Sequence, residues 1–70
     1  MLFRSLSADL FNGLFNLKYL HLDRNRITYL DSSIFSQLEG LEFLYLNYNS
    51  LVSINRHIFN GLDELTSIFI

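Results

Sequence analysis

The feature that most constrains this 70-residue chain is a pattern of apolar residues that recurs every 24 residues. Residues 17–40 and 41–64 share seven identical positions, and each of the seven is either an apolar residue or an asparagine. A fixed period of this length predicts a repeat architecture in which each unit packs against its neighbours. The recurring positions are Leu17, Leu20, Leu22, Asn25, Ile27, Leu30, Ile34, Phe35 and Leu38, and then Leu41, Leu44, Leu46, Asn49, Leu51, Ile54, Ile58, Phe59 and Leu62.

We interpret residues 1–70 as a single array. The 24-residue period divides it into two whole units and two partial ones. Residues 1–16 match the second half of a unit, 17–40 and 41–64 are whole repeats, and 65–70 match the opening of a further unit. Arrays of this kind need polar caps at their ends for solubility, and the pattern shows none here. We therefore expect a fragment of a longer array, and we expect the isolated chain to self-associate through its uncapped ends.

Each unit combines two kinds of periodicity. Residues 20–23 alternate between apolar and polar, which is the period of a β-strand. The apolar residues between 34 and 41 lie within about a third of a helical wheel, which favours one or two short helical or 3₁₀ turns. Ser7, Asp31 and Asn55 stand before these turns at equivalent positions, and all three residue types are good N-caps.

The recurring asparagines and phenylalanines predict an interior of stacked equivalent residues. Asn25 and Asn49 stand where the chain leaves the strand, so their amides can bond to backbone groups that lack a ladder partner. We expect the two asparagines to form a structural ladder, and Phe11, Phe35 and Phe59 to form an interior spine. Ligand contacts by the asparagines and a cofactor pocket among the phenylalanines are the alternatives to these structural roles.

The repeated pattern resembles the leucine-rich repeat. The motif Leu-x-x-Leu-x-Leu-x-x-Asn-x-Leu begins at Leu17, where Ile27 replaces the last Leu, and again at Leu41, and Phe35 and Phe59 mark the second half of each unit. The resemblance implies an α/β solenoid: a leucine-rich-repeat arc with a short parallel β-sheet on the concave side and turns or short 3₁₀ or α segments on the convex side. The 24-residue unit is similar to the "typical" subclass, which is common in extracellular and cell-surface receptors and matrix proteins. Residues 51–70 also look like the last repeats of leucine-rich-repeat receptors of the relaxin-receptor group.

The resemblance and the strand alternation together place the candidate binding surface on the concave face. Residues 24 apart become neighbours at about 4.8 Å in a parallel sheet, so Tyr19 is expected beside Phe43, and His21 beside Tyr45 and then Phe69. Aromatic residues and arginine dominate interface energetics, but Tyr and Phe also favour strands, and aromatic pairs stabilise sheets. The sequence therefore agrees both with ligand binding by these residues and with stabilisation of the sheet by them. The candidate protein-binding residues are Tyr19, His21, Asp23, Arg24, Phe43, Tyr45, Asn47, Tyr48 and Phe69.

The composition and motifs of the chain argue against several classes of function. The chain has no cysteine, a net charge of −2 and no run of like charges, which argues against a disulfide framework and a nucleic-acid interface. It has no nucleophile–base pair, no glycine-rich phosphate loop and no metal-ligand cluster, so we predict no enzymatic activity, cofactor or metal. No apolar run is long enough to span a membrane.

The function predicted from the resemblance is binding of a protein or peptide ligand, as a segment of an extracellular or cell-surface protein such as a receptor ectodomain. The alternative is an intracellular scaffold or adaptor, which the absence of cysteines and of Asn-x-Ser/Thr glycosylation acceptors favours. Three short strands offer a face of roughly 250 Å², whereas a standard interface buries about 800 Å² per partner. We therefore expect this chain to form only part of a binding surface.

Overall fold

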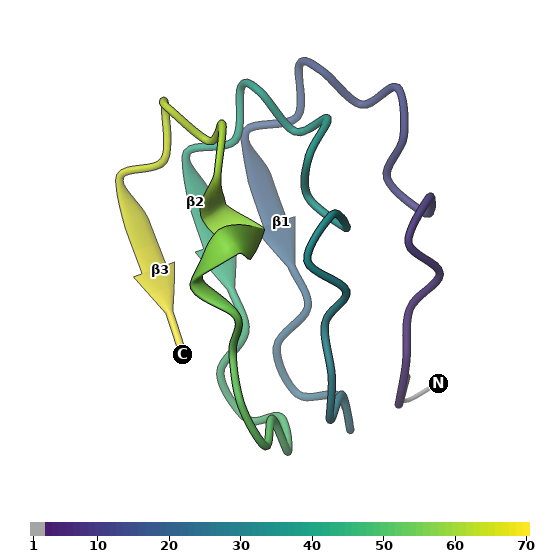
Figure 1. Ribbon diagram of the computed structural model, residues 1–70. Helices are drawn as coiled ribbons and strands as arrows, with labels where there is room; N and C mark the ends of the chain where they lie inside the picture. Colours follow the sequence, from purple (N-terminus) through teal and green to yellow (C-terminus); the bar gives the residue numbers. More distant parts are fainter. Residues whose placement is uncertain (1–2) are drawn as a thin grey trace.

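The computed structural model describes residues 3–70, which contain three short strands, one 3₁₀ helix and a series of hydrogen-bonded turns. Met1 and Leu2 of the predicted first partial unit lie outside the described residues. The elements are β1 (Tyr19–His21), β2 (Phe43–Tyr45), η1 (Arg56–Phe59) and β3 (Ser67–Phe69). Figure 1 shows the three strands side by side, with the two ends of the chain at opposite ends of the stack.

The strands form one parallel sheet in the order β1-β2-β3, and its register follows the sequence period. Leu20 pairs with Leu44, and Leu44 pairs with Ile68, so each central strand residue lies beside its equivalent 24 residues along the chain. A three-residue strand is too short to be stable alone, and lateral pairing supplies its hydrogen bonds. The parallel sheet predicted from the sequence is confirmed, whereas the predicted arc stays a prediction because these strands do not show one.

The core lies behind the sheet and is built from the recurring apolar positions. Within residues 3–70 every buried residue is apolar. The side chains at these positions are buried only when successive units stack, because each unit presents a single apolar face. The buried residues are Phe11, Leu20, Leu22, Ile27, Leu30, Ile34, Phe35, Leu38, Leu41, Leu44, Leu46, Ile58 and Leu62.

A second line of backbone hydrogen bonds joins the units beyond the sheet. The amide of Arg26 donates to the Phe3 carbonyl at 2.8 Å, and the amide of Ser50 donates to the Ile27 carbonyl at 3.0 Å. The amide of Thr28 similarly reaches the Arg4 carbonyl at 3.2 Å. The first partial unit is therefore attached to the array, although its described residues, 3–16, contribute no strand.

The return half of each unit is made of tight turns with bonds between residues three apart. The amide of Ile34 donates to the Asp31 carbonyl at 3.1 Å, and η1 is the one such segment regular enough to form a 3₁₀ helix within residues 3–70. Of the segments predicted for this half, turns and 3₁₀ geometry are found and no α-helix is present in the described chain. No helix among residues 3–70 has the length and apolar character that crossing a bilayer requires.

The predicted N-caps are correct for two of the three positions. The carboxylate of Asp31 accepts the Ser33 amide at 2.9 Å, and the side chain of Asn55 accepts the His57 amide at 2.9 Å. The prediction for Ser7 is wrong: its hydroxyl accepts no backbone amide of its turn, and it donates to the carboxylate of Asp9.

Candidate functional site

The outward face of the sheet carries two rows of stacked rings. In the first row the ring centroids of Tyr19 and Phe43 lie 4.9 Å apart with planes 4° from parallel. In the second row the centroid of Tyr45 lies 4.1 Å from that of His21 and 4.6 Å from that of Phe69. These spacings match the about 4.8 Å between parallel strands, so the register sets the stacking. We call these five residues the aromatic face.

The aromatic face is open to solvent at its margins and closed in its middle. Tyr19, His21 and Phe69 are exposed, whereas Phe43 and Tyr45 are half-buried. Tyr45 is covered because a ring lies against each of its sides. Residues 3–70 form no pocket and place no three metal-ligating side chains together, so the surface suits a partner that covers it more than an enclosed small molecule.

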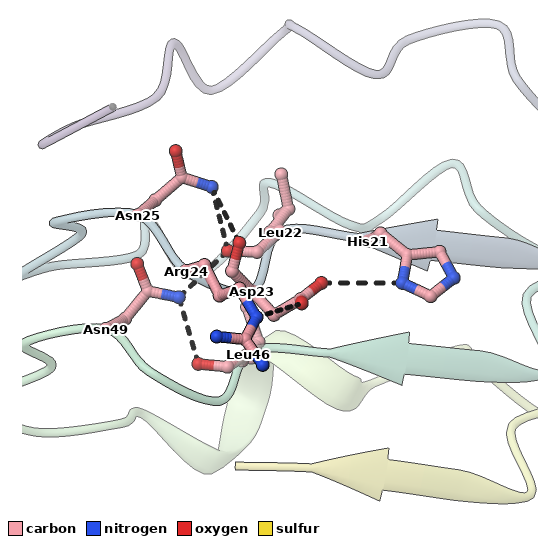
Figure 2. Close-up of polar contacts among 7 residues, drawn as sticks. All are labelled: His21, Leu22, Asp23, Arg24, Asn25, Leu46 and Asn49. Carbon is pink, nitrogen blue, oxygen red and sulfur yellow. Dashed lines mark hydrogen bonds and ion pairs between the residues drawn. The ribbon is translucent and has the colours of Figure 1, made fainter. Parts of the chain in front are cut away.

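A charged group borders the aromatic face at the carboxyl ends of the strands (Figure 2). Asp23 Oδ1 lies 3.4 Å from His21 Nδ1, and Asp23 Oδ2 lies 3.9 Å from Arg24 Nε. The guanidinium carbon of Arg24 lies 4.7 Å from the ring centroid of Tyr48, in cation–π contact. The ion pair between Asp23 and Arg24 lies at the surface, where such pairs contribute only about 0–1 kcal/mol to stability.

Strand length corrects one part of the sequence interpretation. The strands end at His21 and Tyr45, so Asp23 and Asn47, which the alternation placed on the strands, lie beyond them. Arg24 and Tyr48 follow in the same turns, as expected. The side-chain oxygen of Asn47 is buried without a hydrogen-bond partner. Asn47 therefore presents less of its amide to a ligand than the sequence interpretation assumed.

Two backbone features of these turns were missed at the sequence level. Arg24 and Tyr48 both have a φ of 61°, a left-handed conformation that is uncommon for residues other than glycine, asparagine and aspartate. The Arg24 amide donates to the Asn47 carbonyl at 3.0 Å, which ties the first turn to the second. The contact between Arg24 and Tyr48 could have been found in the sequence, since the two residues stand 24 positions apart.

Asn49 connects two consecutive units through its side-chain amide. Its oxygen accepts the Ile27 amide at 3.0 Å. Its nitrogen donates to the Leu46 carbonyl at 2.9 Å and to the Leu22 carbonyl at 2.8 Å. All three partners are backbone groups of buried residues, which matches the role described for a structural ladder.

Asn25 makes two of these three contacts at equivalent positions one unit earlier, and its third bond goes to the Asp23 carbonyl of its own turn. Its oxygen accepts the Phe3 amide at 3.0 Å, and its nitrogen donates to the carbonyls of Leu22 and Asp23 at 3.0 and 3.3 Å. The Leu22 carbonyl accepts from both asparagines, and this shared acceptor joins the two side chains (Figure 2).

The comparison with protein families decides the classification of this chain. The family model described as leucine rich repeat matches residues 2–51 and also residues 15–70. The chain belongs to the leucine-rich repeat family. Repeats of this family commonly mediate protein–protein interactions and are generally not enzymes. A comparison with curated proteins finds no significant match.

The leucine-rich repeat pattern accounts for the interior residues and leaves the aromatic face unexplained. The rings of Phe11 and Phe35 stack with centroids 6.1 Å apart, and Phe59 packs half-buried against the same core. These three phenylalanines and both asparagines lie at fixed motif positions. The aromatic face occupies the positions between the motif residues, so any specificity of this particular array depends on those side chains.

Proposed function

We propose that the aromatic face binds a protein or peptide ligand, within a leucine-rich-repeat protein that acts outside the cell or at its surface. The observation that carries this proposal is the pair of ring rows on one face of the sheet, whose outer members Tyr19 and Phe69 are exposed. Aromatic residues are enriched among the residues that contribute most to binding. Family membership supports the same kind of partner.

The stacking lowers the entropic cost of binding. A ring that already lies against its neighbour has few rotamers to lose, and immobilising a free side chain costs about 0.5–1.5 kcal/mol. Tyr45 is fixed between two rings, and Phe43 lies against one. The face is therefore arranged for contact before a ligand arrives.

The charged group at the border provides orientation. Asp23, Arg24 and His21 lie together at the carboxyl end of β1, beside the second ring row. Charges at the rim of an interface affect specificity and the rate of association more than affinity. A ligand of this face is therefore oriented by charge at one end and held by apolar contact along the strands.

The size of the face limits the affinity. Three strands give roughly 250 Å², about a third of the 800 Å² per partner in a standard interface. We expect isolated peptides to bind this chain only weakly and to require multivalent display for detection.

A peptide-display selection tests the proposal. Multivalent random peptides are selected on the chain, and the pool is then measured on Tyr19→Ser and, as a matched control, on Tyr29→Ser. The two tyrosines are 56% and 62% exposed, and Tyr29 lies outside the strands. We expect binding to fall at least tenfold on Tyr19→Ser and to be unchanged on Tyr29→Ser.

A different outcome of the same experiment would contradict ligand binding by the rings. If the pool binds both variants as it binds the unmodified chain, while Tyr19→Ser and Phe69→Ala lower only the melting temperature, then the rings support the sheet and do not bind. The compartment has its own test, in which antibody staining of intact and permeabilised cells is compared. Staining that requires permeabilisation would favour the intracellular scaffold.

A further inference from the structure

The tetrapeptide Phe-Asn-Gly-Leu occurs twice in the return halves of the units, at residues 11–14 and 59–62. An asparagine followed by glycine is highly prone to deamidation, because glycine has no side chain to hinder attack by its backbone nitrogen on the asparagine carboxamide. Asn12 and Asn60 are both exposed. The chain therefore carries two candidate sites for this modification with the same local sequence.

Deamidation of such a pair requires a free amide on the glycine. At the first site the nitrogen of Gly13 loses its proton and forms a bond to Cγ of Asn12, the bond from Cγ to Nδ2 breaks, and ammonia leaves with a proton. Water then opens the cyclic imide at either carbonyl, which leaves aspartate or isoaspartate. Water is the only co-reactant, so nothing else has to be bound.

The surroundings of Gly13 are open, and one hydrogen bond holds its amide. A Cβ placed on Gly13 would have nothing within 4 Å, and its φ of 86° is a conformation that glycine adopts without strain. The amide donates to Oε1 of Gln37 at 2.6 Å. Gln37 is half-buried and belongs to the next unit, so the stacking of the two units brings this acceptor to the glycine.

We propose that Asn12 is a deamidation site whose reaction Gln37 holds back. A hydrogen-bonded amide proton is harder to remove, because the bond to the acceptor is lost when the proton leaves. The reaction therefore proceeds from the state in which Gly13 has separated from Gln37, and its rate follows the population of that state. The site lies away from the aromatic face, so the proposal goes beyond the proposed function.

The modification would act on the contact between the first two units. Phe11 directly precedes Asn12, is buried, and stacks on Phe35 with ring centroids 6.1 Å apart. Isoaspartate adds a methylene group to the main chain between Phe11 and Gly13, so the ring and the Gly13 amide cannot both keep their positions. We therefore expect the modified chain, which ion exchange separates by its additional negative charge, to melt at a lower temperature than the unmodified chain.

Two variants of Gln37 test the proposal. Gln37→Met has a side chain of similar length without a comparable acceptor, whereas Gln37→Glu keeps an acceptor oxygen and is the matched control. Each chain is incubated at neutral pH and digested, and mass spectrometry follows the replacement of the amide by a carboxyl group at Asn12 and at Asn60. Within residues 3–70 the Gln37 side chain bonds to Gly13 and not to the turn of Asn60, so the rate at Asn60 reports any general loosening of the fold.

We expect the rate at Asn12 to rise about two- to tenfold in Gln37→Met, which is the change in population that the net loss of one hydrogen bond gives. The rate at Asn60 should stay unchanged, and Gln37→Glu should not raise the rate at Asn12. An unchanged rate at Asn12 in Gln37→Met would overturn the proposal. Equal increases at the two asparagines, or an increase of the same size in Gln37→Glu, would also overturn it.

Hydrogen exchange in the unmodified chain gives a test that does not depend on how the variants fold. The Gly13 amide should be protected, and its protection should fall in Gln37→Met. A Gly13 amide that exchanges in the unmodified, folded chain as fast as in a free peptide would overturn the proposal.

Discussion

Replacing Asn49 by alanine is the perturbation whose cost the structure defines most closely. The variant removes three hydrogen bonds to backbone groups. The Ile27 amide and the Leu46 carbonyl belong to fully buried residues, and the side-chain amide of Asn49 is the partner that each loses. The Leu22 carbonyl keeps the bond from Asn25.

An unsatisfied buried group costs about 1–3 kcal/mol, so two such groups give an expected loss of about 3 kcal/mol. A chain of this size has a free energy of unfolding on the order of 4–10 kcal/mol. The loss is therefore a large fraction of the total, and it corresponds to a fall in melting temperature of about 12–24 °C.

Asn25→Ala is the matched control, because it removes the same side chain from the equivalent position. The Phe3 amide lies at the exposed end of the array and can bond to water, and the Leu22 carbonyl keeps its bond from Asn49. We expect a loss of about 1 kcal/mol, the usual net value of a single hydrogen bond.

Urea unfolding followed by far-ultraviolet circular dichroism, at the same dilute concentration for both variants, measures the difference. Hydrogen exchange at the Ile27 amide gives a local readout, since this amide should lose protection in Asn49→Ala and keep it in Asn25→Ala. Equal losses in the two variants, or a loss below about 0.5 kcal/mol for Asn49→Ala, would refute the assignment of these bonds.

Three further predictions concern other positions. Gly40→Ala places a methyl group 2.9 Å from the Phe15 carbonyl oxygen, so we expect a lower urea midpoint; an unchanged midpoint would show that the two segments can separate freely. Phe35→Ala removes a fully buried ring at a cost of about 3–5 kcal/mol, and circular dichroism should show a fall in melting temperature of about 12–40 °C; a fall of only a few degrees would contradict the packing of this ring. The Ser33 hydroxyl, and then the Ser33 amide, lower the pKa of Asp31 below its usual 3.8, so its stabilising effect is present above that pH and is lost as the pH falls through the folded value. The difference in melting temperature between the unmodified chain and Asp31→Asn should accordingly shrink from pH 5 to pH 2, and a constant difference would contradict the assignment.

The register and the core could be predicted from the sequence because both depend on the period alone. Once the 24-residue spacing is known, Leu20 must lie beside Leu44, and Tyr45 must lie between His21 and Phe69. No knowledge of local geometry is needed for these statements. The Phe11 and Phe35 stack follows in the same way.

The backbone of the turns could not be predicted, because the residue types at these positions give no signal for it. Neither Arg24 nor Tyr48 is a residue type that favours a left-handed backbone, yet both adopt one. The Arg24 amide donates to the Asn47 carbonyl of the next unit, but Tyr48 has the same φ without an equivalent bond among the described residues, so this contact does not account for the conformation of both turns. The motif likewise does not specify the buried oxygen of Asn47 or the hydrogen bond from the Ser7 hydroxyl to Asp9.

The sequence also predicts the candidate site only in part. The sequence places the rings on one face, because alternation along a strand decides which side chains point outward. It does not decide between binding and sheet support, because Tyr and Phe serve both purposes and recognition depends on the surface of the partner.

The most direct test of the account is the footprint of a bound peptide on the chain. Amide chemical-shift changes are measured by nuclear magnetic resonance while the strongest peptide from the selection is titrated into the protein. We predict that the largest changes fall on Tyr19, Tyr45 and Phe69 and on the adjoining turn at Asp23 and Arg24. Changes confined to the return half of the units, such as residues 31–38 or 52–60, would contradict the assignment of the aromatic face as the binding surface.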